Sequence, residues 1–202
     1  MKNLLIFRHG QTDWNVLKRF QGHSNIPLNE TGRKQAEALR DFLDNYPVDV
    51  VLSSDLSRAI ETATIALGHR KVPFVKTDCL REAHLGETEG MFNKDIIEKY
   101  GKDFWDRWHA PEDLDFSWPG GETKRENLNR VRSFIEEFVS QHPGQHFAIS
   151  THSGTLKRLC LHAEPLKPNI PLTVENGALF YFQINPENFQ WFLVEKLFVP
   201  EV

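Results

Sequence analysis

Cysteine, long apolar runs and internal repeats are scarce or missing in this chain of 202 residues. Its two cysteines, Cys79 and Cys160, lie far apart and match no metal-binding spacing, which excludes a disulfide framework and a zinc site. The first residues contain only four consecutive apolar side chains, too few for a secretory signal. No later run approaches the roughly 20 apolar residues of a membrane helix. We therefore expect a cytoplasmic protein with no membrane partner.

An excess of one charge is missing as well. The chain has 24 lysine and arginine residues against 28 acidic residues, a net charge of −4, with both signs mixed along the sequence. Such a chain has no extended positive field for a nucleic-acid backbone, so we expect no nucleic-acid partner. Large apolar residues are plentiful by contrast, because 15 Phe and 5 Trp demand burial. We predict a single folded domain over residues 1–202.

Short apolar runs alternate with helical patterns along most of the chain. The runs predict strands over Leu4–Phe7, Val48–Leu52 and His146–Thr151, with a closing pair over 177–182 and 191–197. Apolar residues at helical spacing predict helices over 31–45 and 56–67, and further helices after Thr123 and after His152. This alternation favours an α/β fold, a three-layer α/β/α sandwich with a mainly parallel sheet.

Polar residues at the helix ends refine these predictions. Ser54 or Asp55 is expected to cap the helix over 56–67, and Thr123 with Glu126 matches a capping box. The lysines and arginines along Lys124–Arg132 lie opposite an apolar stripe. We interpret them as a solvated helix face.

One segment, residues 87–118, interrupts the alternation. It contains no apolar strand, and aromatic residues gather in it and at its end. The pattern predicts a helical cap insertion above the sheet, held together by its own aromatic side chains. The segment has nine acidic residues and four lysines or arginines. We therefore expect the cap to disfavour a second phosphate group.

Two histidines lie at the carboxyl ends of predicted strands, His9 after Leu4–Phe7 and His152 after His146–Thr151. Parallel sheets bind ligands at the carboxyl ends of their strands, so the two side chains are expected to meet. Arg8 precedes the first histidine, and Arg58 lies in the opening turn of a helix, where it can face the same crevice. Two arginines, two histidines and a helix amino terminus predict a pocket for one compact dianion, and phosphate is the obvious candidate.

An acid is needed if the pocket does more than bind. Glu82 in Leu80-Arg81-Glu82 supplies a carboxylate that we place at a strand end. Beside phosphate it is expected to take a proton more readily, because a like charge disfavours ionisation. It can then donate that proton to a leaving alkoxide and later accept one from water. Glu87 and Glu89 lie close in sequence and are the alternatives for this role.

Five blocks of sequence stand out between the predicted elements: Arg8-His9-Gly10-Gln11-Thr12 with Trp14-Asn15 and Phe20-Gln21-Gly22, Ser53-Ser54-Asp55-Leu56-Ser57-Arg58-Ala59, Leu80-Arg81-Glu82, Gly120-Gly121-Glu122, and Thr151-His152-Ser153-Gly154. In this order they closely resemble the histidine phosphatase superfamily, in its phosphoglycerate-mutase-like branch. The resemblance runs from residue 5 to residue 158, so it spans most of the chain. A lone Arg-His-Gly triplet is weak evidence, whereas five blocks in the family's order are specific.

The resemblance implies a two-step phosphoryl transfer with a phosphohistidine on His9. Arg8, Arg58 and His152 are implied to hold the phosphate oxygens, and Glu82 to protonate the leaving group. Further residues are implied to line the phosphate or its ester: Asn15, Gln21, Gly22 and the backbone N–H of Ser153. No metal and no cofactor are implied. Ser153-Gly154 departs from the Gly-Gly that is commoner in the family, but serine keeps the backbone donor, so little damage is expected.

Phosphatase, mutase and binding protein are the functions to be weighed. A cofactor-dependent phosphoglycerate mutase is disfavoured by the acidic cap, by the lack of an adjacent Arg-Arg pair there, and by the short chain. A non-catalytic phosphate-binding or scaffold protein is disfavoured because His9 and Glu82 are both present. We therefore expect a metal-independent phosphatase that takes a small-molecule phosphate ester and releases inorganic phosphate. The aromatic cap and scarce extra cations favour a monoester with an uncharged or partly apolar body, and the oligomeric state stays open.

Overall fold

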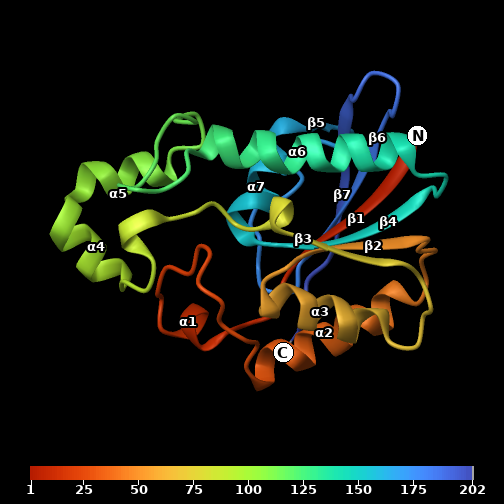
Figure 1. Ribbon diagram of the computed structural model, residues 1–202, viewed down its shortest axis with the longest axis horizontal. Helices are drawn as coiled ribbons and strands as arrows, with labels where there is room; N and C mark the ends of the chain where they lie inside the picture. The colour runs from red at the N-terminus through yellow and green to blue at the C-terminus, as the bar shows by residue number, and fades with distance from the viewer. Residues whose placement is uncertain (202) are drawn as a thin grey trace.

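A seven-stranded sheet forms the centre of the computed structural model, which describes residues 1–201 (Figure 1). The strands lie in the order β3-β2-β4-β1-β6-β7-β5. β1 to β4 pair in parallel, while β6 pairs antiparallel with both β1 and β7. The mainly parallel sheet is thus confirmed. The strands are β1 (Lys2–Arg8), β2 (Val50–Ser54), β3 (Phe74–Thr77), β4 (His146–Thr151), β5 (Glu164–Pro165), β6 (Leu179–Ile184) and β7 (Trp191–Phe198).

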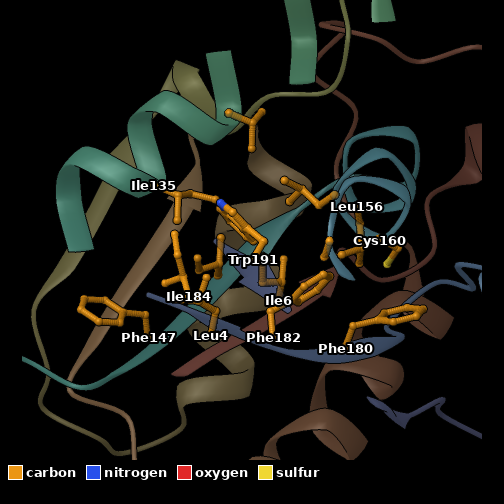
Figure 2. Packing of buried hydrophobic residues seen from close by; sticks show 14 of the residues in the cluster. Leu4, Ile6, Ile135, Phe147, Leu156, Cys160, Phe180, Phe182, Ile184 and Trp191 are labelled. Atoms are coloured by element: carbon orange, nitrogen blue, oxygen red, sulfur yellow. The ribbon is translucent and has the colours of Figure 1, made fainter. Parts of the chain in front are cut away.

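Side chains of β1 alternate between two hydrophobic cores, one on each face of the sheet. Leu4 and Ile6 point into the first core, and Leu5 and Phe7 into the second, as the two-residue period of a strand requires. Figure 2 shows the first core, where Ile135 packs near these strand residues. Because both faces of β1 are buried, its sequence is a continuous apolar run rather than an alternating one.

Helices cover both faces and complete the three-layer sandwich (Figure 1). Residues of α6 and α7 belong to the first core, and residues of α2 and α3 to the second. The remaining short elements lie in loops above the carboxyl ends of the strands or in the cap. The helices are α1 (Asp13–Val16), α2 (Glu30–Leu43), α3 (Ser57–Leu67), α4 (Asn93–Tyr100), α5 (Lys102–His109), α6 (Lys124–Gln141) and α7 (Ser153–His162), with 3₁₀ turns η1 (Asp78–Leu80) and η2 (Gly86–Thr88).

Of the two helix-cap predictions, one is wrong and one is confirmed. Leu56 occupies the N-cap position of α3 without a side-chain hydrogen bond, because Asp55 instead pairs with Arg81 through both of its carboxylate oxygens. Neither Ser54 nor Asp55 therefore caps the helix. The capping box of Thr123 and Glu126 is present at the start of α6.

The segment 87–118 holds α4 and α5, which lie beyond one end of the sheet (Figure 1). Trp118 and Phe116 are almost fully buried there. Phe20, from the loop after α1, packs on Trp118 with ring centroids 5.8 Å apart. The aromatic residues therefore form a small core of their own, as expected of cap packing. No helix formed by residues 1–201 is long and apolar enough to cross a membrane.

Candidate active site

The two histidines lie side by side because β1 and β4 are neighbours in the sheet. Arg8 pairs in register with Thr151, so the residues that follow, His9 and His152, leave the sheet at the same edge. Their rings are 5.2 Å apart at the centroids, and both are almost fully buried. The parallel topology thus brings together residues that are 143 positions apart in the chain.

One ring nitrogen of His9 is held by the backbone. Nδ1 lies 2.6 Å from the carbonyl oxygen of Gly10, which fixes the tautomer that carries its proton on Nδ1. Burial lowers the pKa of His9 well below its usual value, and the charges of Arg58 and Arg8 lower it further. The imidazole is therefore neutral at pH 7, with an unprotonated Nε2. The loop is tied down because the N–H of Gly10 donates to Thr62 Oγ1.

The second histidine is neutral for the same reasons. Burial, followed by the positive charge of Arg58, lowers the pKa of His152 well below its usual value. Its Nε2 lies 2.9 Å from Ser54 Oγ at the end of β2. Its Nδ1 is buried and has no hydrogen-bond partner among the described residues. This nitrogen is available to a bound ligand.

The two arginines are anchored to backbone carbonyls. Nη1 of Arg8 donates to the carbonyl of Val174 at 2.8 Å. Arg58 donates to the carbonyls of Ser24 and Gly22 at 2.7 and 2.8 Å. Burial lowers the pKa of each guanidinium to about 10, although Glu82 acts in the opposite direction. Both side chains are therefore still charged at neutral pH, and their positions are set by rigid backbone.

All nine residues predicted from sequence line one cavity of about 450 Å³. The amide of Asn15 is oriented within it, because its oxygen accepts hydrogen bonds from Thr12 and from Nδ2 of Asn176. That arrangement leaves the NH₂ group of Asn15 for a ligand. Asn176 was missed by the sequence analysis, and it also donates to the carbonyl of His9. The nine residues are Arg8, His9, Asn15, Gln21, Gly22, Arg58, Glu82, His152 and Ser153.

Glu82 reaches the site by a different route from the one expected. β3 ends at Thr77, and the 3₁₀ turn η1 follows, so Glu82 lies in an extended segment five residues beyond the strand. Its carboxylate accepts hydrogen bonds from the N–H groups of Gly154 and Thr155 at 2.7 and 3.0 Å. These are the unpaired donors at the amino terminus of α7. The helix end therefore fixes the position of the Glu82 carboxylate.

The two alternatives to Glu82 have structural roles. Glu87 is exposed and contacts Lys99 and Tyr100 on the cap. Glu89 is turned toward the loop that carries Gly22, where it accepts a hydrogen bond from the N–H of His23 at 2.9 Å. Neither lines the cavity, which leaves Glu82 as its carboxylate.

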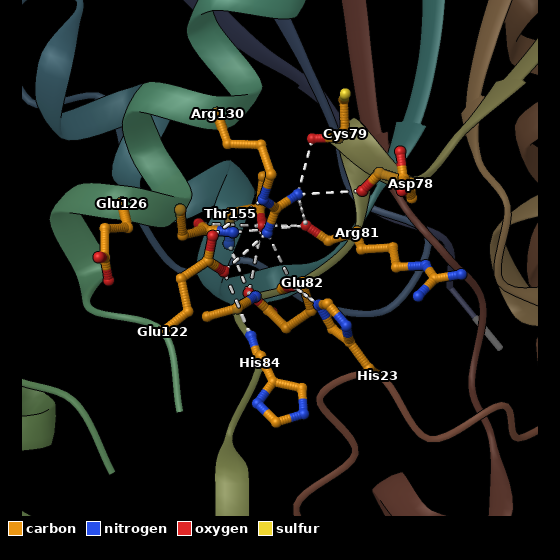
Figure 3. A network of polar contacts seen from close by, with 12 residues as sticks. His23, Asp78, Cys79, Arg81, Glu82, His84, Glu122, Glu126, Arg130 and Thr155 are labelled. Atoms are coloured by element: carbon orange, nitrogen blue, oxygen red, sulfur yellow. Dashed lines mark hydrogen bonds and ion pairs between the residues drawn. The ribbon is translucent and has the colours of Figure 1, made fainter. Parts of the chain in front are cut away.

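An ion pair beneath the site holds the Glu82 segment (Figure 3). Nε and Nη2 of Arg130 donate to the carboxylate of Glu122 at 2.9 and 2.7 Å. The same guanidinium donates to the carbonyls of Cys79 and Glu82 at 2.8 and 3.2 Å. His23 Nε2 lies 2.8 Å from the same Glu82 carbonyl. The Gly120-Gly121-Glu122 block therefore acts on the site through Arg130, one layer away from the cavity.

A side chain at position 154 would displace Glu82 or Arg158, whereas position 153 accommodates serine. A Cβ at Gly154 would lie 2.6 Å from Arg158 Nη1 and 2.8 Å from Glu82 Oε1. Ser153, by contrast, is half-buried and places its hydroxyl 3.5 Å from the carbonyl of Val174. Serine is accommodated there, and as the first residue of α7 it has no helical partner for its N–H.

The cavity is more cationic than the sequence analysis predicted. Lys124 is only 5% exposed and lines the cavity, so it does not belong to a solvated helix face. Arg19, Lys157 and Arg158 line it as well. The expectation of few extra cations is wrong, because these side chains come from outside the acidic cap. The sequence contains one signal, and it concerns Arg158. This residue follows Gly154 by one helical turn, so the two lie on the same face of α7.

Comparisons with known proteins identify the family to which the chain belongs. A family model of the histidine phosphatase superfamily (branch 1) matches residues 4–196. Phosphoserine phosphatase 1 of Hydrogenobacter thermophilus is 32% identical over 160 residues, which cover 79% of this chain and 74% of that protein. A 2,3-bisphosphoglycerate-dependent phosphoglycerate mutase 2 of Gloeobacter violaceus is 31% identical over 173 residues, 83% of this chain and 78% of that protein.

Solved structures show the same fold. A mycobacterial glucosyl-3-phosphoglycerate phosphatase in complex with VO3 has a TM-score of 0.82 and 26% identity, covering 97% of this chain and 99% of that one. A protein of Bacillus stearothermophilus named YhfR has a TM-score of 0.83 and 27% identity, covering 97% and 96%. Fold and sequence thus define a histidine-phosphatase-fold protein. The chain belongs to branch 1 of the histidine phosphatase superfamily.

Proposed function

We propose that the protein is a phosphatase that hydrolyses small-molecule phosphomonoesters through a phosphohistidine on His9. The hydrogen bond from Nδ1 of His9 to the Gly10 carbonyl carries this proposal, because it leaves Nε2 unprotonated and turned to the cavity. The lowered pKa of the ring removes the need for a separate base. In the first step Nε2 attacks phosphorus, so an N–P bond forms as the ester P–O bond breaks.

Arg8, Arg58 and His152 are proposed to hold the phosphoryl oxygens. Both guanidinium groups are anchored and charged, and His152 has an unpaired ring nitrogen at the cavity. Preorganised donors of this kind stabilise the charge that spreads over the phosphoryl group in the transition state. We propose that the arginines supply the positive charge and that no metal is required. Asn15, Gln21, Gly22 and the Ser153 N–H are proposed to complete the phosphate site.

Glu82 is proposed to move the protons. A bound phosphate dianion places a second negative charge next to its carboxylate, and such a pair shares a proton readily. That proton passes to the leaving alkoxide in the first step. In the second step the Glu82 carboxylate takes a proton from water, which attacks phosphorus as the N–P bond breaks. Inorganic phosphate leaves, and Glu82 holds its proton again.

Hydrolysis is favoured over mutase chemistry by the cavity rim. Lys157 and Leu161 line the cavity and are both exposed, so water reaches it. A mutase has to keep water from its phosphohistidine. The acidic composition of the cap no longer counts against a mutase, because Lys124 and Arg158 bring cations from elsewhere. The relatives include both activities, which makes product analysis the deciding test.

The test measures phosphate release from p-nitrophenyl phosphate and 3-phosphoglycerate in the presence of EDTA. We expect turnover in the wild type, no turnover in His9→Ala, and normal turnover in His69→Ala, which alters an exposed histidine elsewhere. Intact-mass analysis after rapid quenching should detect a phosphoenzyme in the wild type and in His69→Ala, but not in His9→Ala. Conversion of 3-phosphoglycerate to its 2-phospho isomer without phosphate release would instead establish a mutase.

The role of Glu82 has a separate test. Glu82→Gln should slow the release of poor leaving groups by about 10²–10⁴-fold, the usual contribution of a general acid. The slowing of p-nitrophenolate release should be much smaller, because that anion leaves without a proton. Equal losses on both substrates would count against the assignment.

A further inference from the structure

The cavity contains three cations to which the proposed chemistry at His9 assigns no role. Lys124 lies at the start of α6, and Lys157 and Arg158 are consecutive residues of α7. All three line the same cavity as His9, together with Trp108 from the cap. Lys124 Nζ and Arg158 Cζ each lie 5.7 Å from the centre of the Trp108 ring. The three cations and this indole therefore form one wall.

Two of these three cations have no carboxylate partner within residues 1–201, and the third has a single long contact with one. Lys124 donates to the carbonyls of Arg107 and Ala110, both at 2.7 Å, and within residues 1–201 neither Lys124 nor Lys157 forms an ion pair. Arg158 is 7% exposed, and its Nε and Nη2 are buried with no hydrogen-bond partner. Its nearest carboxylate oxygen, on Glu82, is 3.8 Å from Nη1. That carboxylate is already engaged by backbone donors.

Other arginines of this chain show what such a group ordinarily binds. Arg81, Arg125 and Arg130 each use Nε and Nη2 together on a single carboxylate. Arg158 has the same pair of donors unused. A buried guanidinium whose Nε and Nη2 have no acceptor is costly, so a site that maintains one is poised for an anionic partner. The proposed phosphoryl site uses Arg8 and Arg58, and it therefore leaves these two donors of Arg158 unassigned.

We propose that the substrate is a phosphomonoester whose alcohol part carries a second anionic group, and that Lys124, Lys157 and Arg158 bind that group. This inference rests on the proposed phosphatase function, which fixes the phosphoryl end of the substrate at His9. It replaces the expectation of an uncharged or partly apolar body. A carboxylate and a second phosphate are the two chemical sources of such a charge, and matched substrates distinguish them.

The test compares pairs of esters that differ in the second charge. One pair is 3-phosphoglycerate and glycerol 3-phosphate, and the other is fructose 1,6-bisphosphate and fructose 6-phosphate. We expect kcat/KM to favour the doubly anionic member of at least one pair by about 10-fold or more, the effect of one hydrogen-bonded charge. A preference for 3-phosphoglycerate in the first pair identifies the second anionic group as a carboxylate. A preference for fructose 1,6-bisphosphate in the second pair identifies it as a phosphate.

Variants locate the preference in the proposed wall. Lys157→Gln should reduce the ratio of kcat/KM values by about 5- to 10-fold, and because Lys157 is exposed, the change leaves packing intact. The matched control is Lys71→Gln, which removes the same charge from the exposed loop before β3, far from the carboxyl ends of the strands. The control should retain the wild-type ratio.

The outcomes separate the two proposals. Hydrolysis of p-nitrophenyl phosphate with no preference in either pair overturns the second-anion site and leaves the phosphatase function standing. A preference that Lys157→Gln leaves unchanged also overturns this site. If the protein releases phosphate from none of the esters, p-nitrophenyl phosphate included, both proposals are overturned.

The pH dependence gives an independent readout. Burial lowers the pKa of Lys124 to about 8, with Asp113 and Glu112 of the cap acting against it and Arg158 and Lys157 of α7 acting with it. Lys124 therefore loses its charge as the pH rises through about 8, and the preference for the doubly anionic ester should fall over that range. Lys124→Arg keeps the charge and should flatten the decline. A decline of the same size in Lys124→Arg would contradict the role of Lys124.

Discussion

Replacing Arg130 with methionine tests how Glu82, the proposed acid, is held in place. Arg130 belongs to α6 and does not line the cavity, yet it joins Glu122 to the backbone of the segment that carries Glu82 (Figure 3). The side chains of Arg130 and Glu122 are 24% and 16% exposed. Arg130→Met leaves the Glu122 carboxylate partly buried without its partner, and it frees the carbonyls of Cys79 and Glu82.

The expected effect has two parts. Removing one partner of a partly buried, bidentate ion pair costs about 2–3 kcal/mol of unfolding free energy. For a chain of this size that cost lowers Tm by about 5–10 °C. The second part is kinetic, because a displacement of Glu82 by about 1 Å slows protonation of a poor leaving group by about 10²-fold. Release of p-nitrophenolate should be affected far less.

The assay combines urea unfolding with kcat on two esters of different leaving-group strength. Arg125→Met is the matched control. Arg125 lies on the same helix as Arg130 and makes the same kind of bidentate contact, with Asp115, but its side chain is exposed. It should cost less than about 1 kcal/mol and leave the leaving-group dependence unchanged. A double-mutant cycle with Glu122→Gln should give a coupling of about 1–2 kcal/mol. Equal loss of kcat on both esters, or a coupling near zero, would refute the reasoning.

Three further predictions follow from the same geometry. Because burial lowers the pKa values of His9 and His152, the unfolded chain takes up protons below about pH 6.5 that the folded chain does not. As the pH is lowered below that value, the free energy of unfolding should therefore decrease. In urea titrations, His152→Gln should make this decrease shallower by up to about 1.4 kcal/mol per pH unit. Gly154→Ala should displace the Glu82 carboxylate and slow poor leaving groups by about 10-fold or more, whereas a change confined to KM would argue against displacement. Asn176→Ala should lower kcat/KM by about 10-fold, with unchanged values showing that Asn15 needs no support.

Much of the fold follows from local patterns in the sequence. The run Leu4–Phe7 has no polar residue because both faces of β1 are buried, and the capping box at Thr123 depends only on residues within one helical turn. Contacts between distant segments are less predictable. Asp55 is a good N-cap residue by type, but Arg81 from another segment binds its carboxylate and removes it from that role.

The candidate site likewise combines features that the local sequence predicts with features that depend on contacts between distant segments. His9 and His152 can be placed from sequence, because each directly follows an apolar run, and parallel strands bring such residues to one edge. Glu82 was identified by its motif, but its approach through η1 and its anchoring on α7 depend on contacts that no local pattern encodes. The distinction between Glu82 and Glu89 likewise required the three-dimensional arrangement.

The sequence by itself determined the alternation of elements, the pairing of the two histidines and the family to which the chain belongs. Only the tertiary structure decided the charge of the cavity. Lys124 and Arg158 lie in ordinary amphipathic helices, and apart from the one-turn spacing of Arg158 from Gly154, nothing in their local sequence separates them from solvated side chains. Their burial is set by the cap and by Trp108, which pack against them from a different part of the chain. A side chain's electrostatic role depends on the desolvation imposed by distant neighbours, and that is a property of the folded chain alone.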